Sequence, residues 1–288
     1  LLRELAASGH PEVRALVRSE RAQKTIEAEG LDPAPEIRIV DYTSPRQMED
    51  AIRGAGCVVH LVGIIKETAA SSYVDAHEGT TAVVAEQAAA AGVERVIYLS
   101  IVGTSIDSAN DCLRSKAAAE NILLTGAVPA LVLRVPMVLG EGDYASAALK
   151  GRATRSTNFL LRGGSLEQPI YAGDVVAAVV RGLTCEAPLA RGLDLAGPES
   201  LSRAELTQAA ARSLGNSTRT VSLPLFLGMV MAWIFERVSA SPPVTRAMLG
   251  VLDHDDQLNV AATLELLELE LTPLQTMLEL CVAGKAPG

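Results

Sequence analysis

Residues 73–100 read YVDAHEGTTAVVAEQAAAAGVERVIYLS, and this stretch decides the fold. Apolar residues recur at helical spacing from Tyr73 to Ala91, and Gly92 suits the left-handed conformation that ends many helices. The run from Val96 to Ser100 is short and apolar, as a buried strand is. A helix followed directly by a buried strand predicts one crossover unit of a parallel sheet.

The same alternation of strands and helices extends over the first half of the chain. The other predicted strands are Val13–Val17, Ile37–Val40, Cys57–Val62 and Leu131–Val135. A capping box at Ser44-Pro45-Arg46-Gln47 predicts a helix that runs to about Arg53. We therefore predict an α/β fold with a doubly wound parallel sheet.

The second half of the chain changes character after Gly140. Residues 1–140 are expected to form the core of the fold, and residues 141–288 to complete it and to form a smaller lobe over the substrate. Asp174 is expected to cap one helix of this lobe, and Ser202-Arg203-Ala204-Glu205 to begin another with a capping box. A strand is expected near Thr218–Leu223.

Composition excludes several classes of protein. The 288 residues are 49% hydrophobic but only 3% aromatic, which is typical of helices packed on a parallel sheet. A formal net charge of −9 argues against a nucleic-acid partner. The four cysteines form no CxxC pair and the four histidines lack metal-ligand spacing, so we expect buried free thiols, no metal and a reducing, cytoplasmic setting.

Several short motifs carry a resemblance to a known family. They include Val13–Arg18 and Asp41 early in the chain, His60-Leu61-Val62-Gly63, Leu99-Ser100, Arg114-Ser115-Lys116, Leu133-Arg134-Val135-Pro136 and Gln168-Pro169-Ile170-Tyr171. In their order and spacing the sequence resembles an atypical, extended-type short-chain dehydrogenase/reductase of the NAD-dependent epimerase/dehydratase kind. It resembles in particular the branch related to the nucleotide-binding accessory subunit of respiratory complex I. The resemblance implies a Rossmann-like fold that binds NAD(P)H.

One departure from that family lies at the start of the sequence. The family begins with a strand and a Gly-x-x-Gly-x-x-Gly turn, whereas Leu1–Ser8 reads as the helix that follows such a turn. We expect the first strand and its glycine turn, on the order of 15 residues, to be missing. Truncation is favoured over a protein that never binds dinucleotide, because the rest of the site is laid out for a cofactor.

The resemblance assigns cofactor-binding roles to residues at three strand ends. Arg18 and Ser19 follow the second strand of the family, and an arginine there can pair with a 2′-phosphate, so NADP(H) is favoured over NAD(H). The alternative is that Arg18 is simply a solvated arginine at a strand end. Asp41 and Tyr42 would lie near the adenine, although Asp41 could equally stabilise a local turn. Val62-Gly63 would border the adenosine ribose, or Gly63 could simply end its strand.

Cys112-Leu113-Arg114-Ser115-Lys116 stands where the family carries Tyr-x-x-x-Lys. Positions 112 and 116 share a helix face, so Lys116 is expected to hold the ribose hydroxyls. A cysteine side chain is too short to reach the atom that the tyrosine protonates, and we expect Cys112 to be a small residue of the helix face. Ser100 remains a candidate for protonation, and Pro136 and Val138 would border the nicotinamide.

The most hydrophobic stretch is Leu223–Phe235, which reads LPLFLGMVMAWIF. It is too short to span a bilayer, which needs roughly 20 apolar residues. We expect it to be a buried helix that shields Trp233. The alternative is a peripheral membrane or protein-complex contact through residues 223–237.

Two functions remain open. The favoured one is an NADP(H)-binding protein with weak or no ordinary tyrosine-dependent dehydrogenase activity, serving as an accessory or assembly protein of a membrane complex and located in the cytoplasm or peripheral to a membrane. The alternative is an NADP(H)-dependent reductase or nucleotide-sugar epimerase-like enzyme that acts on an unknown small-molecule substrate, with protonation from water, Ser100 or the substrate itself.

Overall fold

The computed structural model describes residues 1–10, 12–68, 70–185, 190–239, 242, 244–251 and 254–285. Its first part contains, in chain order, α1 (Leu2–Ala7), β1 (Arg14–Val17), α2 (Glu20–Glu27), β2 (Glu36–Ile39), α3 (Pro45–Ile52), β3 (Cys57–His60), the π-helix η1 (Val74–Gly79), α4 (Thr80–Ala90), β4 (Arg95–Ile101), α5 (Asp111–Leu124) and β5 (Ala130–Val135).

The second part contains β6 (Val138–Leu139), α6 (Tyr144–Ala153), β7 (Thr157–Leu161), β8 (Leu166–Glu167), β9 (Ile170–Tyr171), α7 (Ala172–Thr184), β10 (Arg191–Asp194), β11 (Leu201–Ser202), α8 (Arg203–Ser213), β12 (Arg219–Leu223), α9 (Leu225–Val238), α10 (Arg246–Val251), α11 (Ala261–Leu267), α12 (Leu274–Leu278) and the π-helix η2 (Glu279–Ala283).

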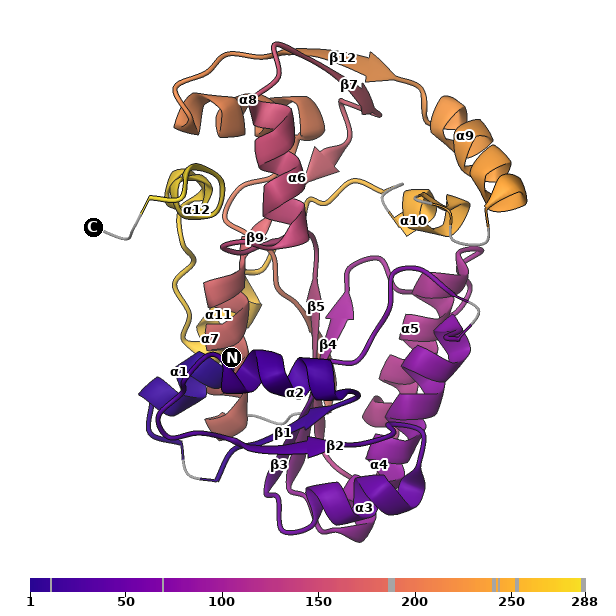
Figure 1. Ribbon diagram of the computed structural model, residues 1–288, viewed down its shortest axis with the longest axis vertical. Coiled ribbons are helices and arrows are strands. Elements are labelled where there is room, and N and C mark those ends of the chain that lie inside the picture. Colours follow the sequence, from indigo (N-terminus) through magenta and orange to yellow (C-terminus); the bar gives the residue numbers. More distant parts are fainter. Residues whose placement is uncertain are drawn as a thin grey trace.

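The central sheet is parallel and has helices on both faces. Strands β10, β5, β4 and β3 pair in that order, and β1 pairs with β2 in a second parallel sheet. Ile97 and Leu131 point toward α7, whereas Tyr98 and Val132 pack with α4 and α5 on the opposite face. Figure 1 shows α7 and α11 on one side of the sheet and α3, α4 and α5 on the other. The predicted doubly wound fold is confirmed.

Local sequence signals account well for the predicted crossover unit. The helix expected from Tyr73 runs continuously through η1 and α4, and Gly92 follows it with a φ of 71°. At α3, the Ser44 hydroxyl accepts a hydrogen bond from the Gln47 amide, as expected. The second half of that capping box is wrong, because the Gln47 side chain accepts from the amide of Asp41. The capping box at Ser202 is complete.

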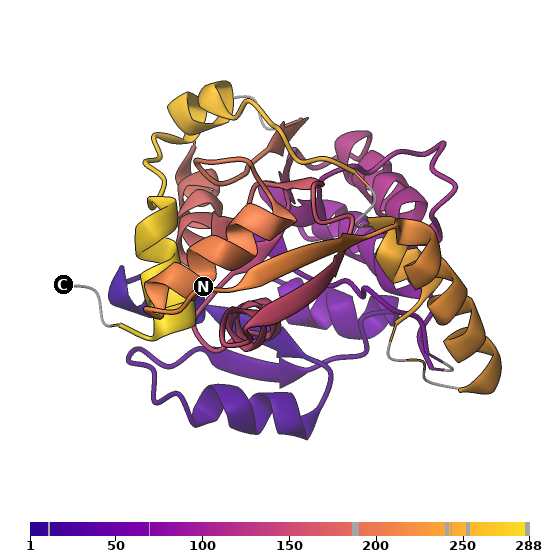
Figure 2. The ribbon, with the colours of Figure 1, turned by 90° about the horizontal axis from the view of Figure 1, so that it is seen from above.

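The later segments form a lobe above the carboxyl ends of the central strands (Figure 1). There β7 and β12 pair in parallel, and they lie across the top of the molecule (Figure 2). A second core fills this lobe; its buried members are Leu139, Leu149, Ala153, Leu206, Ala209, Ala210, Ala211, Leu274, Met277, Leu278, Cys281 and Val282. Part of the second half also returns to the central sheet, because β10 pairs with β5.

Two expectations for this half are wrong. Asp174 lies inside the first turn of α7 and caps nothing; its carboxylate accepts hydrogen bonds from the amide and hydroxyl of Thr272. The apolar stretch from Leu223 is not a buried helix, because Gly228 and Ala232 are the only fully buried residues of α9 and Trp233 is 43% exposed. No described helix combines the length and hydropathy needed to cross a bilayer.

Candidate dinucleotide-binding site

A cavity of about 920 Å³ separates β1 from β3. No described strand pairs with both of these strands, and the cavity takes the place between them. It follows both strands over their whole length, and only the part at their carboxyl ends lies at the edge where ligands bind in open α/β sheets. Five residues predicted to bind the cofactor line it: Arg18, Asp41, Tyr42, Val62 and Gly63.

Arg18 and Tyr42 form one corner of this cavity. The Arg18 side chain is exposed, and its guanidinium carbon lies 5.9 Å from the centroid of the Tyr42 ring. The Tyr42 hydroxyl donates a 2.8 Å hydrogen bond to the Leu16 carbonyl, which fixes the ring against β1. Ser19 lies beside this corner but does not line the cavity; its hydroxyl caps α2 by accepting from the Ala22 amide. A guanidinium held here can meet a phosphate that enters the cavity.

Asp41 has a local structural task within the same wall. Its carboxylate accepts hydrogen bonds from the hydroxyl and the amide of Thr43, at 2.7 and 2.9 Å. These bonds hold the pKa of Asp41 below its usual value, with the Thr43 hydroxyl as the larger cause. The turn that was weighed as the alternative is therefore present. A contact between Asp41 and adenine stays a prediction.

Lys116 lies directly behind Gly63. The lysine is 6% exposed, its Nζ donates to the Leu99 carbonyl at 3.2 Å, and it lies 4.5 Å from the centroid of the Tyr98 ring. A Cβ on Gly63 would stand 3.0 Å from this nitrogen. Burial lowers the pKa of Lys116 to about 8, and no described carboxylate forms an ion pair with it. A buried ammonium group with one carbonyl partner has donors left for a ligand.

His77 fixes the backbone that runs past Lys116, and no motif in the sequence singled it out. The imidazole is fully buried, and burial, followed by the charge of Lys116, lowers its pKa to about 4. Its Nε2 lies 3.0 Å from the Ile64 amide nitrogen and 3.1 Å from the Ile64 carbonyl oxygen, and its Nδ1 lies 2.7 Å from the Ser115 hydroxyl. The loop after β3 is thereby tied to α5 one residue from Lys116.

His60 is the second buried imidazole of this region. Burial, followed by the charge of Lys116, lowers its pKa to about 3, and its Nε2 lies 3.0 Å from the Thr81 hydroxyl. A histidine within an apolar strand is unusual and can be recognised in the sequence, but its partner Thr81 on α4 cannot. Two neutral imidazoles therefore flank one buried lysine.

Cys112 is enclosed, and its thiol faces the loop that follows β3. It is buried, and its Sγ lies 3.8 Å from the Ile64 carbonyl oxygen. Burial raises the pKa of this thiol to about 11, although Lys116 opposes the shift. A thiol with such a pKa is neutral at pH 7 and a poor nucleophile.

Ser100 belongs to a buried polar network. Its hydroxyl donates a 2.5 Å hydrogen bond to Oε1 of Glu120, which also accepts from Thr104 at 2.9 Å. The other oxygen of Glu120 pairs with Arg134 through two bonds of 2.6 and 2.9 Å. An arginine inside an apolar strand was the signal that could have predicted this carboxylate partner. The proton of the Ser100 hydroxyl is thus already used in the hydrogen bond to Glu120.

Pro136 and Val138 lie at the same edge of the sheet, after β5. Both are half-buried, and Val138 pairs with Ile170 where β6 meets β9. Neither lines the cavity between β1 and β3. Their expected contact with nicotinamide stays a prediction.

A histidine from the distant C-terminal half also reaches this edge. The His254 ring lies 3.5 Å from the position of a Cβ on Gly103, three residues beyond Ser100. Its Nε2 is 2.9 Å from a carboxylate oxygen of Asp256. The segment is anchored to β8, since the Asp256 amide donates to the Leu166 carbonyl. This His and Asp pair is partly open to solvent and close to the end of β4.

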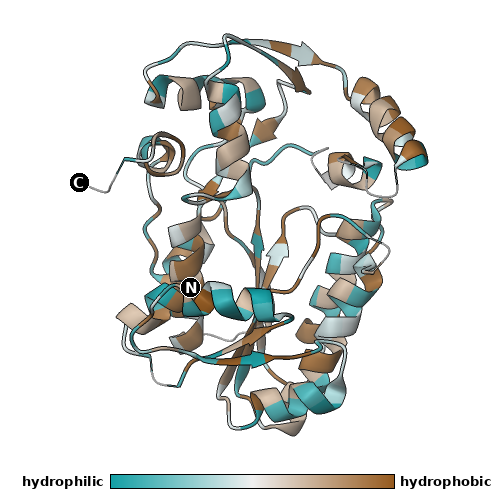
Figure 3. Ribbon diagram, viewed as in Figure 1, coloured by the Kyte–Doolittle hydropathy of each residue, from teal (hydrophilic) through white to brown (hydrophobic). Residues whose placement is uncertain are grey.

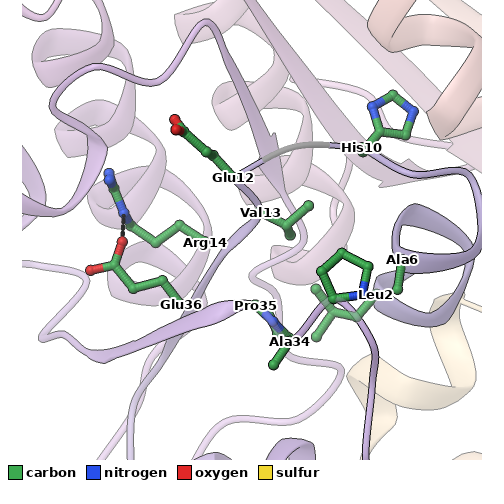
Figure 4. Close-up of a pocket in the computed structure, with 10 residues that line it drawn as sticks. Leu2, Ala6, His10, Glu12, Val13, Arg14, Ala34, Pro35 and Glu36 are labelled. Atoms are coloured by element: carbon green, nitrogen blue, oxygen red, sulfur yellow. Dashed lines mark hydrogen bonds and ion pairs between the residues drawn. The ribbon is translucent and has the colours of Figure 1, made fainter.

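A second cavity, of about 380 Å³, lies at the other end of β1 (Figure 4). Glu12, Arg14 and Glu36 contribute its charged groups, and Arg14 pairs with Glu36 at 2.8 Å. This is the amino end of the strands, opposite to the edge where α/β sheets bind ligands. We assign no function to it.

The fold, with polar and glycine residues at the carboxyl ends of its parallel strands, is that of a Rossmann-type nucleotide-binding protein. Residues 1–157 match the family model described as NAD(P)H-binding, and the chain belongs to that family. It is an atypical short-chain dehydrogenase/reductase related to the accessory subunit of complex I, as the sequence motifs indicated.

Two curated relatives illustrate the range of the family. The chain is 30% identical over 195 residues to the mitochondrial NADH dehydrogenase [ubiquinone] 1 alpha subcomplex subunit 9 of Arabidopsis thaliana, a match that covers 64% of this chain and 48% of that protein. It is 27% identical over 194 residues to the ceramide reductase of Caulobacter vibrioides, covering 66% of this chain and 60% of the relative. The chain thus spans about half to three fifths of their length.

Solved structures confirm the fold over nearly the whole chain. The triphenylmethane reductase of Citrobacter sp., complexed with NADP(H), has a TM-score of 0.74 at 17% identity and covers 97% of this chain and 95% of its own. A nucleoside-diphosphate-sugar epimerase from Staphylococcus aureus has a TM-score of 0.73 at 16% identity, covering 96% and 93%. At these identities the likeness concerns the fold alone.

Proposed function

We propose that this chain binds NADP(H) without ordinary tyrosine-dependent dehydrogenase chemistry and serves as an accessory or assembly protein of a membrane complex. The observation that carries the proposal is the arrangement around Lys116. A buried lysine stands behind Gly63, with two neutral imidazoles nearby, while the thiol of Cys112 is enclosed and protonated. The ligand-holding group is present, and the proton donor of the family is not.

The residues of the cavity fit a phosphorylated dinucleotide. Arg18 offers a planar fork of donors at the end of β1, where the family reads the adenosine ribose, and no carboxylate replaces it. Lys116 would donate to ribose hydroxyls past Gly63, which has no side chain to obstruct them. Arg18 therefore favours NADP(H) over NAD(H), whereas Lys116 would serve either nucleotide.

The groups at the sheet edge explain why ordinary chemistry would be weak. A bound nicotinamide supplies hydride, and reduction of a carbonyl then requires a proton for the developing alkoxide. The Cys112 thiol faces Ile64, and the Ser100 hydroxyl donates to Glu120. Neither can donate without breaking its present contact.

The accessory role is supported by similarity and by an exposed surface. Relatives named as subunits of NADH dehydrogenase in plants and animals match the chain. Most side chains of residues 223–237 are at least partly exposed rather than packed into a core. Their contact with a membrane or a protein complex, and a location in the cytoplasm or peripheral to a membrane, belong to this proposal.

A second candidate function is an NADP(H)-dependent reductase, and His254 favours it. The His254 and Asp256 pair stands next to Gly103, near the end of β4, and an imidazole is a suitable proton donor at neutral pH. Similarity to a ceramide reductase supports the same candidate. An epimerase-like reaction is supported by fold alone.

The two candidates are separated by titration and turnover on the full chain. Calorimetric titration with NADPH and NADH measures binding, and loss of NADPH absorbance with a panel of carbonyl compounds measures reduction. We expect NADPH binding with negligible turnover. Turnover that is abolished in His254→Gln while NADPH binding persists would establish the reductase, and absence of binding to either nucleotide would refute both.

A further inference from the structure

Helix α9 is sharply divided into two faces. At 100° per residue, its exposed apolar side chains fall within an arc of about 160°. They are Phe226, Leu227, Val230, Met231, Trp233, Ile234 and Val238, and we call this set the α9 apolar face. The buried Gly228 and Ala232 lie on the opposite side, where Gly228 meets Leu161 and Leu249. Figures 1 and 2 show the helix at the periphery of the molecule.

We propose that the α9 apolar face lies in the interfacial region of a lipid bilayer. The proposal narrows the contact suggested above for residues 223–237 to one partner, and it does not depend on the nucleotide site. Figure 3 shows α9 as a largely hydrophobic helix with a hydrophilic end. Such a helix is long enough to lie in an interface and too short to span one.

The charged residues of α9 are placed as an interfacial helix requires. The helix carries no acidic residue on its exposed arc, because Glu236 lies on the inner side and pairs with Arg246 at 2.8 Å. The only ionisable group within the arc is Arg237, whose guanidinium carbon lies 4.2 Å from the centroid of the Trp233 ring. An amphipathic aromatic ring beside an arginine with a long apolar stem is the pair that marks the level of lipid headgroups.

The size of this face argues against a protein partner. A helix of 14 residues is about 21 Å long and about 10 Å wide, so its outer side offers on the order of 200–400 Å². A stable protein interface buries about 800 Å² on each partner. A bilayer has no such threshold, because each apolar side chain gains free energy independently as it leaves water.

The net charge of the chain determines which lipid headgroups the α9 apolar face should prefer. With a net charge of −9, the chain is repelled by anionic headgroups, and a single arginine in the face cannot offset this. Binding must then come from apolar insertion, so it should be strongest on neutral lipid and insensitive to salt.

Trp233 is the only tryptophan in the chain, and it reports the contact directly. The full chain is mixed with unilamellar vesicles of pure phosphatidylcholine, and the emission of Trp233 and co-sedimentation are followed. We expect a blue shift, quenching by brominated lipid, and weaker binding when phosphatidylserine is added. The double variant Phe226→Ser, Val230→Ser keeps Trp233 and should bind at least tenfold more weakly. Tyr144→Ser, at an exposed aromatic residue of α6, should bind like the parent.

Three results would overturn the inference. One is a Trp233 emission spectrum that does not change when vesicles are added, and another is equal vesicle binding by the double variant and the parent. The third is a dimer in light scattering that the double variant abolishes, since a second copy would then cover the face. The circular dichroism spectrum of the double variant should match that of the parent. Titration of both proteins with NADPH tests the nucleotide proposal independently of membrane binding.

Discussion

A methyl group on Gly63 would stand 3.0 Å from the ammonium nitrogen of Lys116. The glycine is therefore the only layer between the cavity and the buried cation at this point of the wall. The Leu99 carbonyl and the Tyr98 ring hold the lysine in this position.

Replacing Lys116 with methionine should separate binding from stability. Loss of a charge-assisted hydrogen bond should weaken NADPH binding by about 1 to 3 kcal/mol. Because burial lowers the pKa of Lys116 from 10.5 to about 8, its charge costs stability at pH 7, and the variant should gain about 1 to 3 kcal/mol. That gain should shrink above pH 8, where the folded protein loses this proton before the unfolded chain does.

Calorimetry with NADPH and urea unfolding at pH 7 and pH 10 measure both effects. Lys150→Met, at an exposed lysine of α6, serves as the control and should change neither. A Lys116→Met protein that is less stable at pH 7 would contradict the burial cost assigned to this lysine.

Arg18→Glu should reverse the nucleotide preference. The parent is expected to prefer NADPH by about 1.5 to 3 kcal/mol, the range for a hydrogen bond between charged groups, while a carboxylate would repel the 2′-phosphate. Titration with both nucleotides tests this, and Arg21→Glu on the exposed side of α2 is the matched control. An unchanged preference in Arg18→Glu would remove this residue from the site.

The Cys112 thiol should be inert in the folded protein. Burial and a pKa of about 11 leave only about one thiolate in ten thousand molecules at pH 7. Alkylation followed by mass spectrometry should label Cys112 only after denaturation, while the half-buried Cys57 and Cys185 react earlier. Cys112→Ala should leave NADPH affinity within about 0.5 kcal/mol. Rapid labelling of the native thiol would contradict this account.

The two buried imidazoles should make the protein sensitive to acid. His60 and His77 have pKa values of about 3 and about 4, below the usual 6.5, so the unfolded chain binds more protons than the folded one between these values. Stability therefore falls as the pH falls below 6.5, by about 2 kcal/mol for each histidine between pH 7 and pH 5. Urea unfolding of His77→Gln should show about half of the parent's loss. An unchanged loss would mean that other groups take up the protons.

Local patterns in the sequence predicted much of the fold because they depend on near neighbours. Ser202 and Glu205 form their capping box within one helical turn, and Gly92 ends its helix by its own backbone conformation. Asp174 could not be assigned in this way, since its partner Thr272 is 98 residues away. The nearby placement of Lys116 and Gly63 likewise depends on the pairing of β3 with β4.

The α9 helix shows a different limit of sequence reasoning. Its hydropathy is that of a core segment, but hydropathy alone does not say whether protein or another apolar medium covers the side chains. Only the packing of Gly228 on Leu161 reveals which side faces inward. Of the candidate site, the residues at strand ends followed from the family resemblance, whereas the Glu120 and His77 networks required the tertiary structure.

Residues 261–282 contribute to two of the hydrophobic cores in the described part of the chain. Leu267 belongs to the core between the central sheet and α7, and Met277 and Leu278 belong to the core of the upper lobe. Neither core can therefore be completed while the chain is being synthesised until these residues have left the ribosome. Folding should wait for the last helices, and a stalled nascent chain would expose apolar surface from both halves to chaperones at the same time.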